Sequence, residues 1–376
     1  MKNYGKTTVS EFLGDMIVYR NLAPVDTRIP SLEALREETG IPAGVFPRKH
    51  EPAYARAVAH MLHAARALDE PYTSLARLVY LGDTRMSDGA AFVNLCKATR
   101  CPGMAFIGAE TLDEPEMDLI EQDAGTTCLA NRWSMLSDFE ALCDDYEFRI
   151  DKRTVVIIDL DKTALGARGR NASVIDQARV SAVRRTVEDL LGTAFDAANF
   201  RQSYITLNQP EFHPFTADNQ DYLAYVCLII GSGLYRTVPL IDDIRGGLVK
   251  DFAQFIGEVD ARADDLPANL RGLHDDIIAR VRAGDPTPFK AFRYNEYQET
   301  IGRMGYMLDD TPVNNLLENE VVITREVREV ALKWKAQGAL LFGLSDKPDE
   351  ASIPTAEQSA RGLQPIHRTE THSVGE

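Results

Sequence analysis

Two aspartates, Asp159 and Asp161, follow a run of four apolar residues, Val155–Ile158, with a single residue between them. The apolar run predicts a buried strand, and residues two apart on a strand point to the same face. The two carboxylates would therefore crowd together at the carboxyl end of that strand. Like charges held so close are costly unless a cation or a proton-transfer role compensates them. The stretch therefore indicates a site that binds a cation or moves a proton.

A second pair of carboxylates follows another short apolar strand. Within the segment Ala76–Leu95, this strand runs into Gly82 and Asp83, a loop reaches Asp88, and a helix follows. In sheets of parallel strands, ligands bind at the carboxyl ends of the strands. We therefore expect both pairs of carboxylates at one edge of one sheet.

Strands alternate with helices on both sides of a long helical stretch, a pattern typical of an α/β fold with a doubly wound parallel sheet. The long stretch has helical periodicity throughout and emerges directly after the paired aspartates, so we expect a large α-helical cap beside the site. The last residues lack apolar periodicity and are expected to be disordered. The predicted parts are a first core part in 1–164, the cap insertion in 165–320, a second core part in 321–352 and a disordered tail in 353–376.

Five further segments are assigned by their local patterns. The expected elements are a helix over Tyr54–Leu68, a buried strand over Pro102–Glu110, an acidic loop over Asp113–Asp123, a helix over Ser134–Phe148, and a helix, a glycine and a strand within Thr324–Ala351. On the first of these helices, His60 and His63 lie three residues apart. Because no third ligand is near them, we interpret these histidines as packing or surface residues rather than as a metal site.

Composition narrows the class of protein. The chain has 376 residues, 44% of them hydrophobic, which is enough for sizeable cores. Its formal charge of −16 excludes nucleic acid and anionic membranes as expected partners, because both attract clustered positive charge. Five scattered cysteines fit reduced thiols, and neither a signal peptide nor a membrane span is recognisable. We therefore expect a cytoplasmic protein.

The sequence Asp159-x-Asp161-x-Thr163 resembles the first motif of the haloacid dehalogenase superfamily. Three further stretches resemble the other motifs of that family: "ALLFGLSDKP" the second, at Ser345; "FPRKHEPAYARAV" the third, at Lys49; and "LGDTRMSD" the acidic fourth, at Asp83 and Asp88. The resemblance covers the core segments and leaves the helical insertion unmatched.

The order of these motifs departs from that of the family. Along this chain the third and fourth motifs come before the first, and the second comes last. This is a circular permutation of the family's order, with new termini between the second and third motifs. Proteins tolerate circular permutation because chain ends and loop connections commonly lie at the surface. The resemblance thus implies a circularly permuted core with a Rossmann-like sheet.

The resemblance also implies a chemistry for each motif. Asp159 is expected to be the nucleophile that forms an aspartyl-phosphate, and Asp161 the general acid and then the general base. The implied Mg²⁺ ligands are Asp159, Asp161, Asp83 and Asp88. The implied phosphate-binding residues are Ser345, Lys49 and Thr163, and in the turn after the first motif either Arg168 or Arg170 is expected to reach the substrate.

Several alternatives stay open at this point. Lys347 could serve in place of Lys49, and Thr206 could replace Ser345, although Thr206 lacks the helix and glycine that lead into the second motif. The expected activity is hydrolysis of a small phosphorylated metabolite. The alternatives are phosphoryl transfer to an acceptor other than water, and a non-catalytic binding protein that retains the fold.

Overall fold

The computed structural model describes residues 1–376, which divide into two compact units. The first unit contains residues 1–177 and 300–376, and the second contains residues 178–299. The second unit spans fewer residues than the cap insertion predicted over 165–320. The reason is that Leu165, Val174 and Met304 are buried in a hydrophobic core of the first unit.

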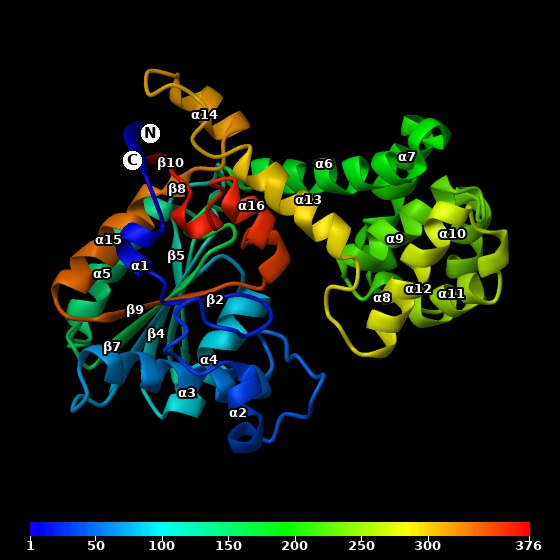
Figure 1. The fold of residues 1–376 in the computed structure, drawn as a ribbon. Coiled ribbons are helices and arrows are strands. Elements are labelled where there is room, and N and C mark those ends of the chain that lie inside the picture. Colours follow the sequence, from blue (N-terminus) through cyan, green and yellow to red (C-terminus); the bar gives the residue numbers. More distant parts are fainter. The chain divides into compact units, whose positions relative to one another are not determined.

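A seven-stranded sheet forms the centre of the first unit (Figure 1). Neighbouring strands are parallel except for one edge strand, β5, which runs antiparallel to β6. In spatial order the strands are β2 (Ile17–Val18), β9 (Leu340–Leu344), β7 (Thr154–Asp159), β3 (Arg77–Gly82), β4 (Gly103–Gly108), β6 (Gly125–Ala130) and β5 (Met117–Gln122). The predicted α/β class with a mostly parallel sheet is confirmed.

The three strands that lead into Asp83, Asp159 and Ser345 lie side by side. β7 pairs with β9 on one side and with β3 on the other. In register, Asp159 lies opposite Leu344 and Ile158 lies opposite Leu81. The carboxyl ends of these strands therefore meet at one edge of the sheet.

Helices cover both faces of this sheet. Strand alternation sends Tyr80 and Ile157 into the core under one set of helices, and Leu81 and Ile158 into the core under the other set. Figure 1 shows α3 and α4 on one side and α5 and α15 on the other. The first set is α2 (Leu32–Thr39), α3 (Pro52–Asp69) and α4 (Ala90–Thr99), and the second is α1 (Ser10–Leu13), α5 (Leu136–Asp145) and α15 (Arg325–Ala336). The sheet is thus doubly wound.

The acidic segment Asp113–Asp123, predicted to be a loop, contains the edge strand β5. Its side chains are exposed or half-buried, and charges such as Asp118 and Glu121 are common on edge strands because they discourage pairing with other chains. The acidic composition led to the prediction of a loop. The segment is a strand because all six residues of β5 pair with β6.

The tail over 353–376, predicted to be disordered, is ordered and contains α16 (Ala356–Ala360) and β10 (Thr371–Gly375). β10 pairs with both β1 (Lys2–Thr7) and β8 (Ile323–Thr324) in a second, three-stranded sheet. All five residues of β10 are buried, although four of them are not hydrophobic. The sequence prediction was wrong because it looked for apolar periodicity, which this strand does not have.

The second unit is helical, as predicted. Its core contains most of one apolar helix, α9, together with residues from the helices around it. Its elements are the continuation of α6 (Ala172–Leu191), α7 (Ala197–Leu207), α8 (His213–Thr216), α9 (Gln220–Gly231), α10 (Thr237–Arg245), α11 (Phe252–Asp260), α12 (Ala268–Arg282) and the start of α13 (Lys290–Ile301), whereas α14 (Val313–Asn319) belongs to the first unit. None of the helices combines the length and the apolar character needed to cross a membrane.

Candidate active site

Three aspartates meet where β7 and β3 end. Asp83, Asp88 and Asp159 are buried and offer carboxylate oxygens that lie within 4.8 Å of one another. Among the described residues, this is the one group of three or more His, Cys, Asp or Glu side chains whose ligand atoms lie close enough to share a metal ion. The structure therefore unites three of the four residues that the sequence predicts as metal ligands.

Lys49 lies against this cluster from the loop before α3. Its Nζ donates hydrogen bonds to Asp159 Oδ1 at 2.5 Å and to Asp88 Oδ1 at 2.7 Å. Burial alone would lower the pKa of Lys49, but the charges of Asp159 and Asp88 raise this pKa well above its usual value. Lys49 is therefore a buried cation that offsets part of the negative charge.

Asp88 is held by five hydrogen bonds from groups around it. Its Oδ1 accepts from Lys49 and from the Tyr80 hydroxyl at 3.0 Å. Its Oδ2 accepts from the backbone N–H groups of Asp83 at 3.1 Å and Thr84 at 2.9 Å, and from the Thr84 hydroxyl at 2.9 Å. Although burial opposes ionisation, Lys49 and these donors hold the pKa of Asp88 well below its usual range. Asp88 thus fixes both the lysine and the loop that carries Asp83.

That loop contains a single π-helical turn, η1 (Arg85–Gly89). Such turns are rare and often occur at functional sites. Here the turn lets the Asp88 carboxylate fold back onto the end of β3, where the backbone N–H groups of Asp83 and Thr84 become its donors.

The other two carboxylates are much less stable as anions. Burial raises the pKa of Asp159 well above its usual value, and the charges of Asp88 and Asp83 add to this effect while Lys49 opposes it. Burial and the charge of Asp88 also raise the pKa of Asp83 to about 7, against the influence of Arg168. A further cation between Asp83 and Asp159 would relieve this repulsion.

Asp161 lies beside the cluster rather than in it. Its side chain is 26% exposed, and its Oδ1 is 3.9 Å from the Nζ of Lys347. The Oγ of Ser345, which follows β9, accepts a hydrogen bond from the backbone N–H of Lys347 at 3.1 Å. The two lysines that the sequence left as alternatives thus have different places, with Lys49 among the aspartates and Lys347 beside Asp161.

Three residues of the turn after β7 have distinct roles. Thr163 is fully buried and its Oγ1 donates to Asp159 Oδ2 at 2.9 Å, so this hydroxyl positions the carboxylate. Arg168 pairs with Asp83 and keeps a side chain that is 38% exposed. Arg170 has a side chain that is 2% exposed and pairs with two half-buried glutamates, Glu110 and Glu326. Of the two arginines expected to reach a substrate, Arg168 is the more exposed, whereas the guanidinium of Arg170 is held by ion pairs within the first unit.

Sequence reasoning missed two groups that support Asp88, namely Tyr80 and Thr84. Tyr80 was counted among the apolar residues of its strand, yet its hydroxyl bonds to Asp88. A tyrosine within an otherwise aliphatic strand was the available signal, because a buried hydroxyl needs a partner. Thr206, the rival of Ser345, lies within helix α7 rather than at the end of a strand.

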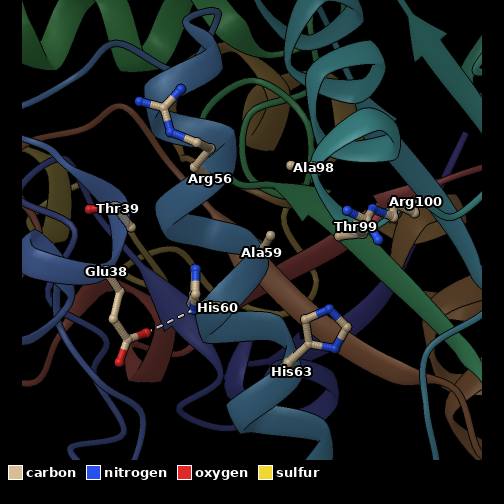
Figure 2. Close-up of a pocket in the computed structure, with 9 residues that line it drawn as sticks. All are labelled: Glu38, Thr39, Arg56, Ala59, His60, His63, Ala98, Thr99 and Arg100. Carbon is tan, nitrogen blue, oxygen red and sulfur yellow. Dashed lines mark ion pairs between the residues drawn. The ribbon is translucent and has the colours of Figure 1, made fainter.

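Two of the cavities on the first unit involve residues singled out in the sequence. One, of about 310 Å³, adjoins the cluster at Asp83 and is lined also by Arg85, Asp118 and Asn131. The other, of about 520 Å³, lies between α2, α3 and α4 and is lined by residues that include His60 and His63 (Figure 2).

In the larger cavity, His60 Nδ1 is 3.2 Å from Glu38 Oε2, and Figure 2 shows this pair on one side of the pocket. Burial and the nearby His60 lower the pKa of His63. Neither histidine belongs to the cluster of Asp83, Asp88 and Asp159, which is the candidate metal site.

Comparison with protein-family models finds no match, and searches of curated proteins and of solved structures find none either.

Proposed function

We propose that this protein is a Mg²⁺-dependent phosphohydrolase that cleaves a small phosphate monoester, and that it is a circularly permuted member of the haloacid dehalogenase superfamily. The observation that carries the proposal is the contact between Lys49 and Asp159, which are 110 residues apart in sequence, at the edge where β9 presents Ser345. Nothing in the local sequence requires these segments to meet.

The donor set fits a hard divalent cation. Asp83 and Asp159 supply anionic oxygens, which Mg²⁺ prefers over nitrogen or sulfur. Burial, and after it the neighbouring carboxylates, raises the pKa values of both groups, and a bound cation would oppose this effect. When bound, the metal would neutralise charge on the phosphoryl group that an anionic nucleophile must approach.

In the proposed first step, a carboxylate oxygen of Asp159 attacks phosphorus and forms an acyl phosphate. The bond from phosphorus to the ester oxygen breaks, and Asp161 gives its proton to the departing alkoxide. Asp161 then takes a proton from water, whose oxygen attacks phosphorus and releases Asp159 and inorganic phosphate. The partial exposure of Asp161 and its place beside the buried cluster suit this exchange of protons with substrate and water.

The remaining residues bind and orient. Lys49 and Ser345 would donate to phosphoryl oxygens, whereas Thr163 keeps one oxygen of Asp159 occupied and so directs the other. The cavity beside Asp83 has room for a small leaving group. All five cysteines are free and buried, as suits the reducing cytoplasm that we propose as the location.

The test is a panel of phosphorylated metabolites incubated with the protein and either Mg²⁺ or EDTA. We expect release of inorganic phosphate that needs Mg²⁺, and a loss of at least about a thousandfold in kcat for Asp159→Asn, because an amide is a poor nucleophile. Thermal stability of Asp159→Asn should be unchanged or higher, since burial penalises the carboxylate. The exposed Asp138→Asn serves as the control with normal activity.

Full activity in EDTA would exclude the metal site, and near-normal turnover by Asp159→Asn would exclude the nucleophile. Product analysis separates hydrolysis from phosphoryl transfer, because transfer yields a new phosphoester instead of inorganic phosphate.

A further inference from the structure

The hydroxyl of Tyr54 has no hydrogen-bond partner, whereas the nearby Lys49, Asp88 and Asp159 side chains all have partners. Tyr54 lies in the first turn of α3, five residues after Lys49, and is 1% exposed. Its hydroxyl oxygen is fully buried and makes no hydrogen bond within the protein. Burying a hydroxyl without a partner costs folding free energy, so a group of this kind calls for an explanation.

Other buried tyrosines show how unusual this is. The hydroxyl of Tyr19 bonds to His367 at 3.1 Å, that of Tyr80 to Asp88 at 3.0 Å and that of Tyr225 to His274 at 2.6 Å. Each of these hydroxyls stabilises the fold through a partner far away in sequence or on another element. Tyr54 contributes nothing comparable to the fold.

The surroundings of Tyr54 connect its hydroxyl with the candidate site. The charges that act on its hydroxyl are those of Asp346, Lys49, Arg20 and Asp159, which places the hydroxyl at the edge of the aspartate and lysine cluster. Burial keeps the phenol protonated, because it raises the pKa of Tyr54 above the usual value. The hydroxyl is therefore a hydrogen-bond donor with no acceptor.

The helix that carries Tyr54 adds to this donor. α3 has 18 residues, its N-cap residue Glu51 makes no side-chain capping bond, and Pro52 follows it. Helix N-termini attract anions through their unpaired N–H groups and the helix dipole. A buried cation (Lys49), a helix N-terminus (Pro52) and a neutral donor (Tyr54) thus lie within six residues of chain.

We propose that the Tyr54 hydroxyl donates a hydrogen bond to a phosphoryl oxygen of the bound substrate, and that Tyr54 is a catalytic residue of the reaction proposed above. The inference rests on that proposed function. In this role the hydroxyl would be satisfied only when a phosphoryl group is present, and it would stabilise the charge that develops on the phosphoryl oxygens during attack by Asp159.

The test uses Tyr54→Phe in the full chain, with two readouts. Removing the hydroxyl deletes no bond within the protein, so the melting temperature should stay unchanged or rise. At the same time kcat/KM for the best phosphate monoester should fall about tenfold to a hundredfold, and the affinity for inorganic phosphate, measured by calorimetry with Mg²⁺ present, should fall about tenfold.

Tyr19→Phe is the matched control. It removes a buried hydroxyl that does have a partner in the protein, His367, and so should lower the melting temperature by about 2–4 °C. Phosphate affinity and kcat/KM of this variant should stay at the wild-type values. The two tyrosines would then show opposite patterns, with function lost in one and stability lost in the other.

Unchanged kcat/KM and phosphate affinity in Tyr54→Phe would overturn the assignment, and so would a drop in its melting temperature with activity intact, which would show that the hydroxyl has a structural role. A wild-type protein that neither binds inorganic phosphate nor hydrolyses the esters would instead refute the proposed function itself, and the role of Tyr54 would fall with it.

Discussion

At the scale of single residues, the position of the Asp88 side chain requires a glycine at position 82. The Asp88 side chain folds back over Gly82 so closely that a Cβ added to Gly82 would lie 2.6 Å from the Cβ of Asp88. Real Cβ atoms essentially never come this close, so any larger residue must displace Asp88. The glycine before Asp83 is therefore required by the space that Asp88 needs, and through Asp88 it affects the position of Lys49.

We expect Gly82→Ala to lower the free energy of unfolding by about 1–3 kcal/mol, the usual cost of overpacking, and to weaken the Mg²⁺-dependent activity proposed above. The measurements are urea unfolding and activity assays at several Mg²⁺ concentrations. Gly257→Ala in α11 is the control, because nothing lies within 4 Å of an added Cβ there. That substitution should instead stabilise by about 0.5–1 kcal/mol. Equal effects of the two substitutions would contradict the steric explanation.

At the scale of elements, the carboxyl-terminal segment is held by buried polar contacts instead of apolar ones. Glu320 is fully buried and accepts hydrogen bonds from the Thr371 hydroxyl at 2.9 Å and from the backbone and ring of His372 at 3.2 and 2.7 Å. Further upstream, His367 is fully buried between Tyr19 and Asp15. These contacts explain why a segment with few apolar residues is ordered.

His367 makes the anchoring of this segment depend on pH. Its Nδ1 is 3.1 Å from the Tyr19 hydroxyl and its Nε2 is 3.2 Å from Asp15 Oδ1, an arrangement that suits a neutral ring accepting at Nδ1 and donating at Nε2. Burial lowers the pKa of His367 below its usual 6.5, although Asp15 opposes the effect. The unfolded chain therefore binds a proton at His367 more readily than the folded chain does.

The contribution of His367 to stability should thus be fully present above pH 6.5 and decline as the pH falls below that value. The measurement compares the melting temperatures of wild type and His367→Gln between pH 8 and about pH 5. Other groups titrate in both proteins, so the difference between the two isolates His367. We expect the pH dependence to be smaller in the variant. A variant whose melting temperature falls as steeply as that of the wild type would show that His367 is not responsible.

At the scale of the whole molecule, each unit has its own hydrophobic core. Two clusters, one on each face of the sheet, belong to the first unit, and one large cluster belongs to the second. Units with separate cores commonly unfold as separate cooperative transitions. The chain should therefore show two transitions in scanning calorimetry.

Two substitutions assign these transitions. Ile157→Ala removes fully buried apolar volume from β7, and Ile229→Ala does the same in α9. Each should cost about 2–5 kcal/mol. We expect each variant to lower the temperature of one transition and leave the other in place. A single transition that both variants shift would contradict independent unfolding of the two units.

The amino-acid sequence by itself predicted many of the elements and the meeting of Asp83 with Asp159, because these depend on local patterns. The periodicity over Tyr54–Leu68 corresponds to α3, and the apolar runs before Asp83 and Asp159 correspond to β3 and β7. Since carboxyl ends of parallel strands meet at one edge, the convergence of these two aspartates followed from their positions at strand ends.

Only the tertiary structure decided which groups are partners, because those contacts join segments far apart in the chain. It paired Lys49 with Asp159 and left Tyr54 without a partner, and it enclosed Arg170 between two glutamates. It also inserted β10 between β1 and β8, where pairing on both sides orders a strand that no local pattern indicates. Hydrogen bonds and burial of this kind depend on which strands and helices become neighbours, and that arrangement is a property of the whole chain.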